Sequence, residues 1–383
     1  MEELTGSDAL VMISTSEIDA NLYYATRFAA PDPFIFIQAG AEKIAVMSDL
    51  EMDRARSQAR VDTVLSYSAY ERRAREKGVD APSALDVLDL VLRERGAHHL
   101  LVPGNFGIEY ADGLRARGYT VAVRREPFFE TRLMKNEEEV EAITATQRAT
   151  EEAVDAAISA IRAAKVESSG FLYLDGELLT AEMLKKIMHV TLMERECVAQ
   201  YTIVAPGLQG VDPHHHGTGP IRVHESIVID LFPRSERSRY FADMSRTVVK
   251  GKASPKLRAM YGAVLNAQER GIELIRDGAD GKIIHAEVNA VLEKDGFTTG
   301  MVGGRMQGFF HGTGHGIGLD IHEPPRINKT GAVLRTGHVV TVEPGLYYPD
   351  AGAVRIEDLV VVTGAGCRNL TTFPKGIGEL EID

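Results

Sequence analysis

Short apolar runs alternate with amphipathic stretches over the first third of the chain. Runs rich in branched and aromatic side chains predict strands at 9–14, 34–37, 43–47, 62–67, 99–102 and 119–123. Apolar residues that recur every three or four positions predict helices near 16–27, 50–59, 84–95 and 108–117. Strands that alternate with helices are typical of an α/β domain. We therefore expect such a domain over residues 1–133, without a phosphate-binding glycine motif.

The pattern changes from residue 134 onward. Three acids at 137–139 begin a stretch rich in Ala, Ile and Glu, and acids in a first turn suit the helix dipole. Helices are predicted from there to Lys165 and at 180–194, 255–276 and 282–294. Strands are predicted at 225–232, 239–249, 338–348 and 353–363, in adjacent pairs that indicate antiparallel hairpins. Residues 134–383 are therefore predicted to form a second domain, of the α+β class.

The first predicted hairpin carries a carboxylate on each strand. Asp230 interrupts the apolar run 226–232, and Asp243 lies in 239–249, beyond a polar loop. A hairpin centred on that loop places Asp230 opposite Asp243 on one face. Like charges that face each other destabilise a sheet, and a buried carboxylate without a partner is costly. We expect a cation between them, or a proton on one of them.

The second predicted hairpin repeats this arrangement. Pairing of 338–348 with 353–363 about Asp350 brings Glu343 near Glu357. A single acid inside a strand is usually a bulge or part of an ion pair. Two hairpins that each bear a facing pair of carboxylates favour a shared site instead.

A glycine-rich segment, HGTGHGIGLDIHEPP at 311–325, lies between the hairpins. Its glycines disfavour a helix, since each costs about 1 kcal/mol in a helix interior. They suit a strand or loop that approaches a ligand closely. A lone histidine on an apolar face is usually a core residue. Three in this setting, His311, His315 and His322, indicate a ligand or acid–base role.

The composition limits the chemistry open to such a site. Two cysteines, Cys197 and Cys367, are too few for a cysteine zinc site or a disulfide framework. The net charge of −12, from 43 basic and 55 acidic side chains, argues against binding to nucleic acid or an anionic membrane. We find no apolar run long enough to cross a bilayer and no secretory signal in MEELTGSDAL. We therefore expect a cytoplasmic protein.

One imidazole and four carboxylates form an oxygen-rich ligand set. The set suits two divalent ions of the Mn, Co, Fe or Zn type, with shared carboxylates and an open position for water. Such a pair lowers the pKa of a bound water and polarises a carbonyl group. The predicted chemistry is hydrolysis, most simply of an amide.

These residues resemble the creatinase-fold, or pita-bread, metallopeptidases, which include Xaa-Pro dipeptidases (prolidases), Xaa-Pro aminopeptidases and methionine aminopeptidases. The resemblance rests on HGTGHGIGLDIHE, TVEPGLY and VRIEDLVVVT and extends from about residue 135 to 383. It implies a pita-bread catalytic domain preceded by a smaller creatinase-type α/β domain. It also implies a homodimer and a short proline-containing peptide as substrate.

The resemblance assigns a metal role to five residues. Asp230 would bind one ion, and Asp243 and Glu357 would bridge both ions. His315 and Glu343 would complete the second ion. A metal-bridging hydroxide would attack the scissile carbonyl, and Glu343 would carry a proton to the leaving nitrogen.

The resemblance also implies roles beside the metals. His311 and His322 match positions that contact the substrate and stabilise the tetrahedral intermediate. Arg355 matches an arginine that orients the cluster or the substrate, although a plain ion pair would explain it equally well. One active-site histidine is usual before the first Asp strand, and here the spacing favours His214. The tract with His215 and His216 could also be a surface metal binder.

Two departures from the family pattern leave the substrate range open. The separation of Asp230 and Asp243 is two residues longer than is usual in the family, and Phe232 stands in place of a glycine. Dipeptidase and aminopeptidase both remain possible, whereas the N-terminal domain argues against a methionine aminopeptidase. The alternatives are a metal-free creatinase-like amidinohydrolase and a non-catalytic binding protein, which typically lack the full ligand set. Manganese is the expected ion, and Co, Zn or Fe would also be accepted.

Overall fold

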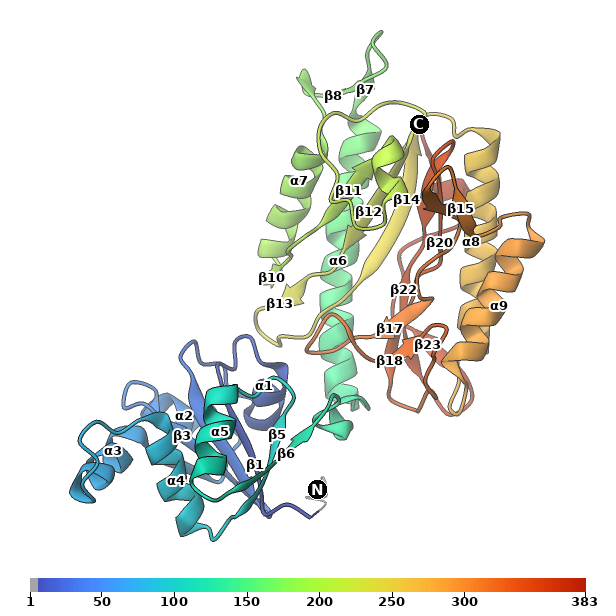
Figure 1. Ribbon diagram of the computed structural model, residues 1–383. Coiled ribbons are helices and arrows are strands. Elements are labelled where there is room, and N and C mark those ends of the chain that lie inside the picture. The colour runs from blue at the N-terminus through green and yellow to red at the C-terminus, as the bar shows by residue number, and fades with distance from the viewer. Residues whose placement is uncertain (1–5) are drawn as a thin grey trace. The chain divides into compact units, whose positions relative to one another are not determined.

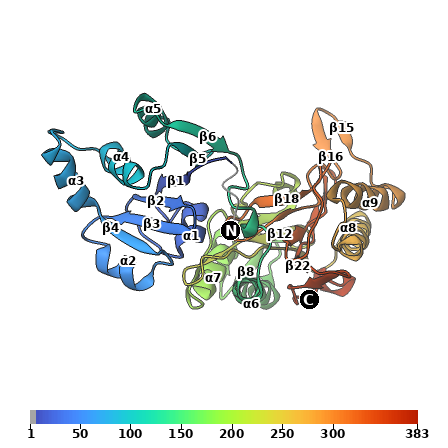
Figure 2. The same ribbon diagram turned by 90° about the horizontal axis from the view of Figure 1, so that it is seen from below.

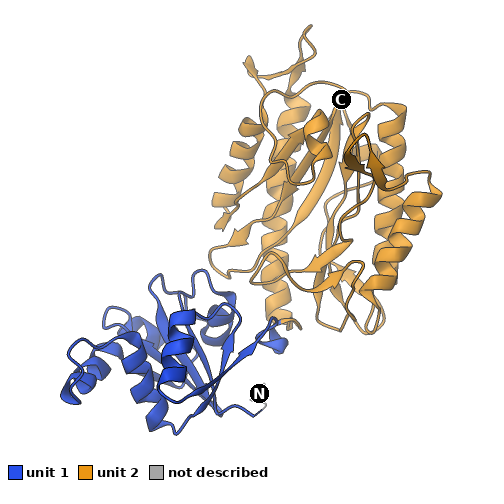
Figure 3. Ribbon diagram, viewed as in Figure 1, with its two compact units in different colours: residues 1–132 blue, residues 133–383 orange. Residues whose placement is uncertain are grey.

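A computed structural model describes residues 6–383, and the chain divides into two compact units, residues 1–132 and 133–383 (Figure 3). Each unit has its own buried apolar clusters. None of the helices in the described part of the chain has the length and apolar character needed to cross a membrane.

The first unit is a six-stranded sheet with helices on both faces (Figure 2). The strand order is β4-β3-β2-β1-β5-β6, and β2 runs antiparallel to both of its neighbours. The elements are β1 (Ala9–Ser14), α1 (Ala20–Thr26), β2 (Phe34–Ala39), β3 (Glu42–Met47), α2 (Met52–Gln58), β4 (Thr63–Ser66), α3 (Tyr67–Glu76), α4 (Ala84–Glu94), β5 (His99–Pro103), α5 (Ile108–Ala116), β6 (Thr120–Arg124) and η1 (Glu130–Arg132). Side chains alternate along β1, so that Val11 packs toward α3, α4 and α5 and Met12 toward α1 and α2.

The six strands predicted for this unit are confirmed, but the sequence did not predict α3. Half of the residues of this helix are charged, and it buries only Tyr70 and Ala74. The side chain of Ser66 caps its start by accepting a hydrogen bond from the backbone N–H of Ala69. A short apolar stripe with one cap stabilises this helix, and its apolar periodicity is too weak to detect.

The second unit is built around two sheets that lie between two pairs of helices (Figure 1). One sheet has the order β11-β12-β14-β24 and the other β18-β17-β19-β22-β23. The elements are α6 (Glu137–Ala163), β7 (Lys165–Val166), β8 (Leu172–Leu174), β9 (Glu177–Leu178), α7 (Ala181–Met193), β10 (Cys197–Val198), β11 (Ile203–Pro206), η2 (Gly207–Val211), β12 (Ser226–Leu231), β13 (Arg234–Ser235), β14 (Met244–Lys250), α8 (Pro255–Leu274), α9 (Gly281–Lys294), β15 (Gly300–Val302), β16 (Arg305–Gln307), β17 (Gly314–Gly316), β18 (Glu323–Ile327), β19 (Val339–Val342), β20 (Gly345–Tyr348), β21 (Gly352–Arg355), β22 (Asp358–Val362), β23 (Cys367–Asn369), η3 (Ile377–Glu379) and β24 (Glu381–Ile382).

The helices of this unit bury the outer faces of the sheets. Helix α6 begins at a capping box formed by Asn136 and Glu139, and with α7 it packs on β12 and β14. Helices α8 and α9 pack on the other side, against β19 and β22 of the five-stranded sheet and against the separate two-stranded pair β20 and β21. The inner faces of the strands are left to surround a cavity.

The register predicted for the second hairpin is confirmed. Val339 pairs with Val361 in β19 and β22, and Tyr348 pairs with Gly352 in β20 and β21, so one register runs through both ladders. The predicted long strands are each broken in the middle, where Pro344 has no N–H to give to a ladder. Glu343 and Glu357 lie in this gap between the two ladders.

The register predicted for the first hairpin is wrong by two residues. Asp230 pairs with Ser245, not with Asp243. The turn closes later than expected, because Ser235 donates its backbone N–H to Tyr240 O and Arg239 adopts a left-handed φ of 65°. Asp243 precedes β14 and lies diagonally across from Asp230, on the same face.

The backbone of Gly314 lies close to that of the neighbouring strand β19. A Cβ at this position would lie 1.9 Å from the carbonyl oxygen of Thr341 in β19. We expect Gly314→Ala to lower the free energy of unfolding by about 3 kcal/mol or more. The added methyl group would clash with a backbone oxygen, which cannot rotate away as a side chain could. Urea unfolding measures the change. Gly300→Ala is the control, because a Cβ there meets nothing within 4 Å; equal losses in both variants would contradict the prediction.

Candidate metal centre

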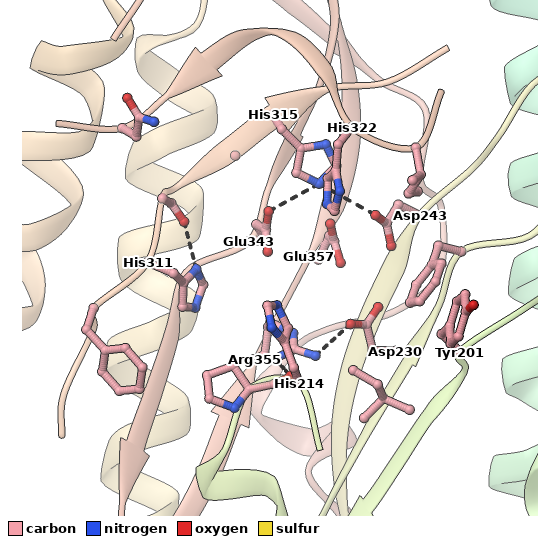
Figure 4. Close-up of a pocket in the computed structure, with 18 of the residues that line it drawn as sticks. Tyr201, His214, Asp230, Asp243, His311, His315, His322, Glu343, Arg355 and Glu357 are labelled. Atoms are coloured by element: carbon pink, nitrogen blue, oxygen red, sulfur yellow. Dashed lines mark hydrogen bonds and ion pairs between the residues drawn. The ribbon is translucent and has the colours of Figure 1, made fainter. Parts of the chain in front are cut away.

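The second unit contains a cavity of about 870 Å³ that collects the predicted site residues (Figure 4). Asp230 reaches it from β12, His315 from β17, and Asp243 from the segment before β14. Glu343 and Glu357 enter from the gap in the second hairpin. All five residues that were predicted as metal ligands therefore line one cavity.

Asp243, His315 and Glu357 form the tightest group. One potential ligand atom from each lies within 4.8 Å of the others, and all three residues are buried. His315 Nε2 lies 3.7 Å from Asp243 Oδ2. Ser245 holds the Glu357 carboxylate by donating from its Oγ to Oε2 at 2.9 Å. The other Glu357 oxygen, Oε1, remains free to face a ligand.

The local backbone sets the tautomer of His315. Its Nδ1 lies 3.1 Å from the carbonyl oxygen of Gly316, which requires the proton on Nδ1. Nε2 is then a lone-pair donor that points into the cavity, 3.4 Å from Glu343 Oε1. Thr341 helps to position both His315 and Glu343. Its Oγ1 accepts a hydrogen bond from the backbone N–H of His315 and lies 3.2 Å from Glu343 Oε1.

Arg355 forms an ion pair with Asp230, one of the predicted metal ligands. Its Nη2 lies 2.6 Å from Asp230 Oδ2, with both side chains largely buried. Its Nε donates to Ser245 Oγ at 2.9 Å, and its Nη1 donates to Tyr347 Oη at 3.0 Å. Arg355 therefore orients one carboxylate of the cluster and one phenol.

His311 lines the cavity, but both of its ring nitrogens are engaged. Nδ1 lies 2.8 Å from the carbonyl oxygen of Gly312, and Nε2 lies 2.9 Å from Tyr347 Oη. Burial and the charge of Arg355 lower the pKa of His311 to about 3, so the ring is neutral. In this arrangement Nε2 of the ring accepts a hydrogen bond from the Tyr347 hydroxyl and positions the phenol.

His322 differs from His311, because its ring forms no hydrogen bond to any described residue. The ring lines the cavity and packs edge-on against His315, with centroids 4.3 Å apart. Its backbone is held by the next residue, Glu323, which forms a buried ion pair with Lys135. His322 is thus free to contact a bound molecule.

The three-histidine tract divides between the cavity and its own loop. His214 and His216 line the cavity, and His214 is labelled in Figure 4. His215 instead accepts a hydrogen bond at Nδ1 from the backbone N–H of Gly217. Phe232 also lines the cavity, as its position two residues after Asp230 predicts.

The sequence reasoning missed several residues that shape the site. Ser245, Thr341 and Tyr347 bond to Glu357, Glu343 and His311, respectively, and each lies two or four residues from a predicted site residue. The period of two in a strand could have identified them. Arg326 was also missed; it pairs with His315 across β17 and β18 and lines the cavity.

Burial and mutual repulsion disfavour charge on these acids. Burial, reinforced by the charge of Glu357, raises the pKa of Asp243, and burial together with Glu343 raises the pKa of Glu357. Burial raises the pKa of Glu343 to about 7, although Arg355 opposes the shift. Burial lowers the pKa of His315 to about 3, so this ring is neutral and able to bind a metal.

The donor set fits divalent cations. Asp230 Oδ1, Asp243 Oδ1 and Glu357 Oε1 are buried without a hydrogen-bond partner among the described residues. Buried carboxylate oxygens are expected to be paired or to coordinate a metal. With the lone pair of His315, they offer the hard, mixed O/N set that first-row divalent ions accept.

The pKa of Glu343 predicts how pH acts on the metal-free protein. Because the folded-state pKa of about 7 exceeds the ordinary value of 4.5, the folded state holds a proton that the unfolded state has lost between these limits. Stability of the metal-free protein should therefore fall as pH rises from 5 to 8. A divalent ion replaces that proton, so the rise in Tm caused by Mn²⁺ should be larger at pH 8.

Calorimetric melting of chelator-treated and Mn²⁺-loaded protein at the two pH values measures this effect. Glu343→Gln removes the titrating group and should shrink the pH dependence. A Mn²⁺-induced rise in Tm that is the same at both pH values would contradict the prediction.

Known proteins share this sequence pattern and this fold. The sequence profile of metallopeptidase family M24 matches residues 141–364. The chain is 34% identical over 243 residues to a Xaa-Pro dipeptidase from Pyrococcus furiosus, which is 63% of this chain and 63% of that relative. The match thus spans just under two thirds of the relative's length.

Two solved structures share the fold over nearly the whole chain. An X-Pro aminopeptidase from Thermotoga maritima has a TM-score of 0.81 at 23% identity, with 97% of each chain covered. A Xaa-Pro dipeptidase from Bacillus anthracis has a TM-score of 0.82 at 22% identity, with 98% of this chain and 95% of that chain covered. The predicted fold class, a pita-bread domain preceded by a smaller α/β domain, is confirmed. Because the M24 profile matches more than half of its residues, the chain belongs to metallopeptidase family M24.

Proposed function

We propose that the protein is a dinuclear metallopeptidase that hydrolyses the Xaa-Pro bond of dipeptides. The observation that carries this proposal is the set of unpartnered, buried carboxylate oxygens around His315 in one cavity. Membership of the M24 family and the likeness to a Xaa-Pro dipeptidase support it. The full ligand set disfavours a metal-free amidinohydrolase or a binding protein.

The proposed metal ligands are the five residues of the cavity. Asp230 would hold one ion, His315 and Glu343 the other, and Asp243 and Glu357 would serve both. Two bound ions would supply an activated water and polarise the scissile carbonyl. We further propose manganese as the ion, a homodimer, as the family resemblance implies, and a cytoplasmic location, as the sequence composition indicates.

The remaining side chains have tasks that follow from their contacts. Glu343 would, as the family resemblance implies, take up a proton from the activated water and release it to the leaving nitrogen. His322 has free ring nitrogens for the substrate carbonyl. His311 and Arg355 both hydrogen-bond to the buried hydroxyl of Tyr347, which therefore holds these two cavity residues in place. His214 borders the substrate space.

Arg326 favours a dipeptidase over an aminopeptidase. Its Cα pairs with that of His315, so its side chain lies on the same face, and it lines the cavity. The guanidinium forms no ion pair or hydrogen bond with a described residue. A dipeptide carries a free carboxylate just beyond the scissile bond, and a guanidinium binds such a group with two hydrogen bonds. We propose that Arg326 holds the carboxyl terminus of the dipeptide.

Removal of a shared ligand tests the reaction. Asp243→Asn and Glu357→Gln should each lower Mn²⁺-dependent hydrolysis of Ala-Pro by more than about 100-fold, since losing even an outer-shell partner of a metal can cost that much. Release of proline measures the rate. The control is Asp350→Asn, which should keep wild-type activity. Asp350 is an exposed acid in the turn of the hairpin that carries Glu357. Unchanged turnover in either ligand variant after metal removal would sink the proposal.

Truncation of the proposed carboxylate contact tests the substrate class. Arg326→Met should lower kcat/KM for Ala-Pro about 10- to 100-fold, because a hydrogen bond to a charged group contributes about 1.5–3 kcal/mol. The amidated substrate Ala-Pro-NH₂ lacks the carboxylate, so the same substitution should leave its kcat/KM close to the wild-type value. Equal losses on both substrates would contradict this role. Wild-type cleavage of Ala-Pro-Ala as fast as Ala-Pro would indicate an aminopeptidase instead.

A further inference from the structure

Arg246 lies behind the cavity and has no part in the roles assigned so far. It belongs to β14, next to Ser245, whose hydroxyl faces the cavity and holds Glu357. Because neighbouring side chains of a strand point to opposite faces, the Arg246 side chain extends away from the cavity. It is almost fully buried, with 2% of its side-chain surface exposed.

Every nitrogen of this guanidinium donates a hydrogen bond. Nη1 donates to the carbonyl oxygens of Glu357 and Ser245, at 2.6 and 2.9 Å. Nη2 donates to Asp358 Oδ1 at 2.9 Å and to the carbonyl oxygen of Phe373 at 2.8 Å. Nε donates to the carbonyl oxygen of Pro374 at 3.1 Å. A lysine could not match this planar set of donors.

These bonds join the two sheets at the point where the ligands enter the cavity. Ser245 belongs to the four-stranded sheet, whereas Asp358 begins β22 of the five-stranded sheet. The backbone links them through a hydrogen bond from Glu357 N to Ser245 O at 3.1 Å. Arg246 bonds to that same Ser245 oxygen and to the oxygen of Glu357, so it clamps the junction from behind.

Asp358 is in turn fixed by a second cation. Its Oδ2 accepts from Lys375 Nζ at 2.6 Å and from Asn369 Nδ2 at 2.9 Å. The carboxylate therefore has partners on both oxygens and cannot rotate toward the cavity. The buried pair of Arg246 and Asp358 therefore supports Glu357, which precedes Asp358 in the chain and whose carbonyl oxygen accepts from Arg246.

We propose that Arg246 is a positioning residue for the metal centre, which fixes the separation of Glu357 from Asp243 by clamping the two sheets together. The inference rests on the proposed dinuclear site. A bridging carboxylate must hold its place to within a fraction of an ångström to serve two ions. Loss of the clamp should therefore have a larger effect on the affinity for metal ions than on the stability of the fold.

Binding of Mn²⁺ to the metal-free, full-length protein tests this role. The loss of the free-ion EPR signal during titration gives affinity and stoichiometry without an activity assay. Arg246→Lys should lower Mn²⁺ affinity about 10- to 100-fold, the usual cost of removing an outer-shell partner of a metal. At saturating Mn²⁺, its KM for Ala-Pro should stay close to wild type, because Arg246 touches no substrate.

Lys250 provides a matched control on the same strand and the same face. It is buried and donates to the carbonyl oxygens of Arg162 and Asp383, far along β14 from the ligands. Lys250→Met should lower the Tm and leave the Mn²⁺ affinity unchanged. A second variant, Asp358→Asn, keeps the shape of the clamp but weakens its charge, and should lower the affinity less than Arg246→Lys does.

The outcomes separate this inference from the proposed function. Wild-type affinity in Arg246→Lys, or an equal loss of affinity in Lys250→Met, would overturn the role of Arg246 alone. If Arg246→Lys does not fold, the result for Asp358→Asn decides, and unchanged affinity there overturns the role. Failure of the wild-type protein to bind Mn²⁺ would overturn the proposed function and this inference together, whereas Mn²⁺ binding without hydrolysis of Ala-Pro would overturn the proposed function alone.

Discussion

Repulsion among four carboxylates in one cavity, two of them buried and two partly buried, is the constraint on which the second unit depends. Asp230, Asp243, Glu343 and Glu357 line one cavity, and Arg355 is the cation that pairs directly with one of them. Without further positive charge, burial and mutual repulsion hold the pKa values of three of these acids well above their ordinary range. The site is therefore unstable as a set of four anions and becomes stable when protons or metal ions neutralise it.

The surrounding structure keeps these acids together despite their repulsion. Pro344 breaks the second hairpin so that Glu343 and Glu357 leave the ladders and turn into the cavity. Ser245 and Thr341 orient individual oxygens from the cavity side. From the opposite side, Arg246 joins the two sheets through backbone carbonyl groups. Local hydrogen bonds thus determine the shape of the site, and the helices that cover the sheets supply the apolar burial.

The family relationship and the geometry contribute different parts of the account. The M24 profile and the shared fold establish what kind of protein this is. The contacts within the cavity distinguish residues that could otherwise be treated alike: His311 has both nitrogens engaged, whereas His322 has neither. Arg355 is ion-paired to Asp230, whereas Arg326 forms no ion pair with any residue that the structure describes. This difference is what makes Arg326 the better candidate for a substrate carboxylate.

Much of the fold, and the set of residues that meet in the cavity, could be predicted from the sequence, because acids in apolar strands and histidines among glycines are strong signals. The register of the second hairpin was predictable because its turn is symmetric about Asp350. The predicted register of the first hairpin is wrong by two residues. The turn is closed by a left-handed conformation of Arg239, which the sequence does not indicate. Arg326 and Arg246 could not be identified, since an arginine in a strand shows its role only through contacts with residues distant in the chain.

The central claim is that these carboxylates hold two metal ions. Anomalous diffraction at the manganese absorption edge, from crystals grown with Mn²⁺, tests it most directly. The account predicts two anomalous peaks in the cavity, one beside Asp230 and one beside His315 and Glu343, with Asp243 and Glu357 between them. A fully loaded crystal with no peak in the cavity, or with a single peak that leaves Asp230 without a metal, would contradict it.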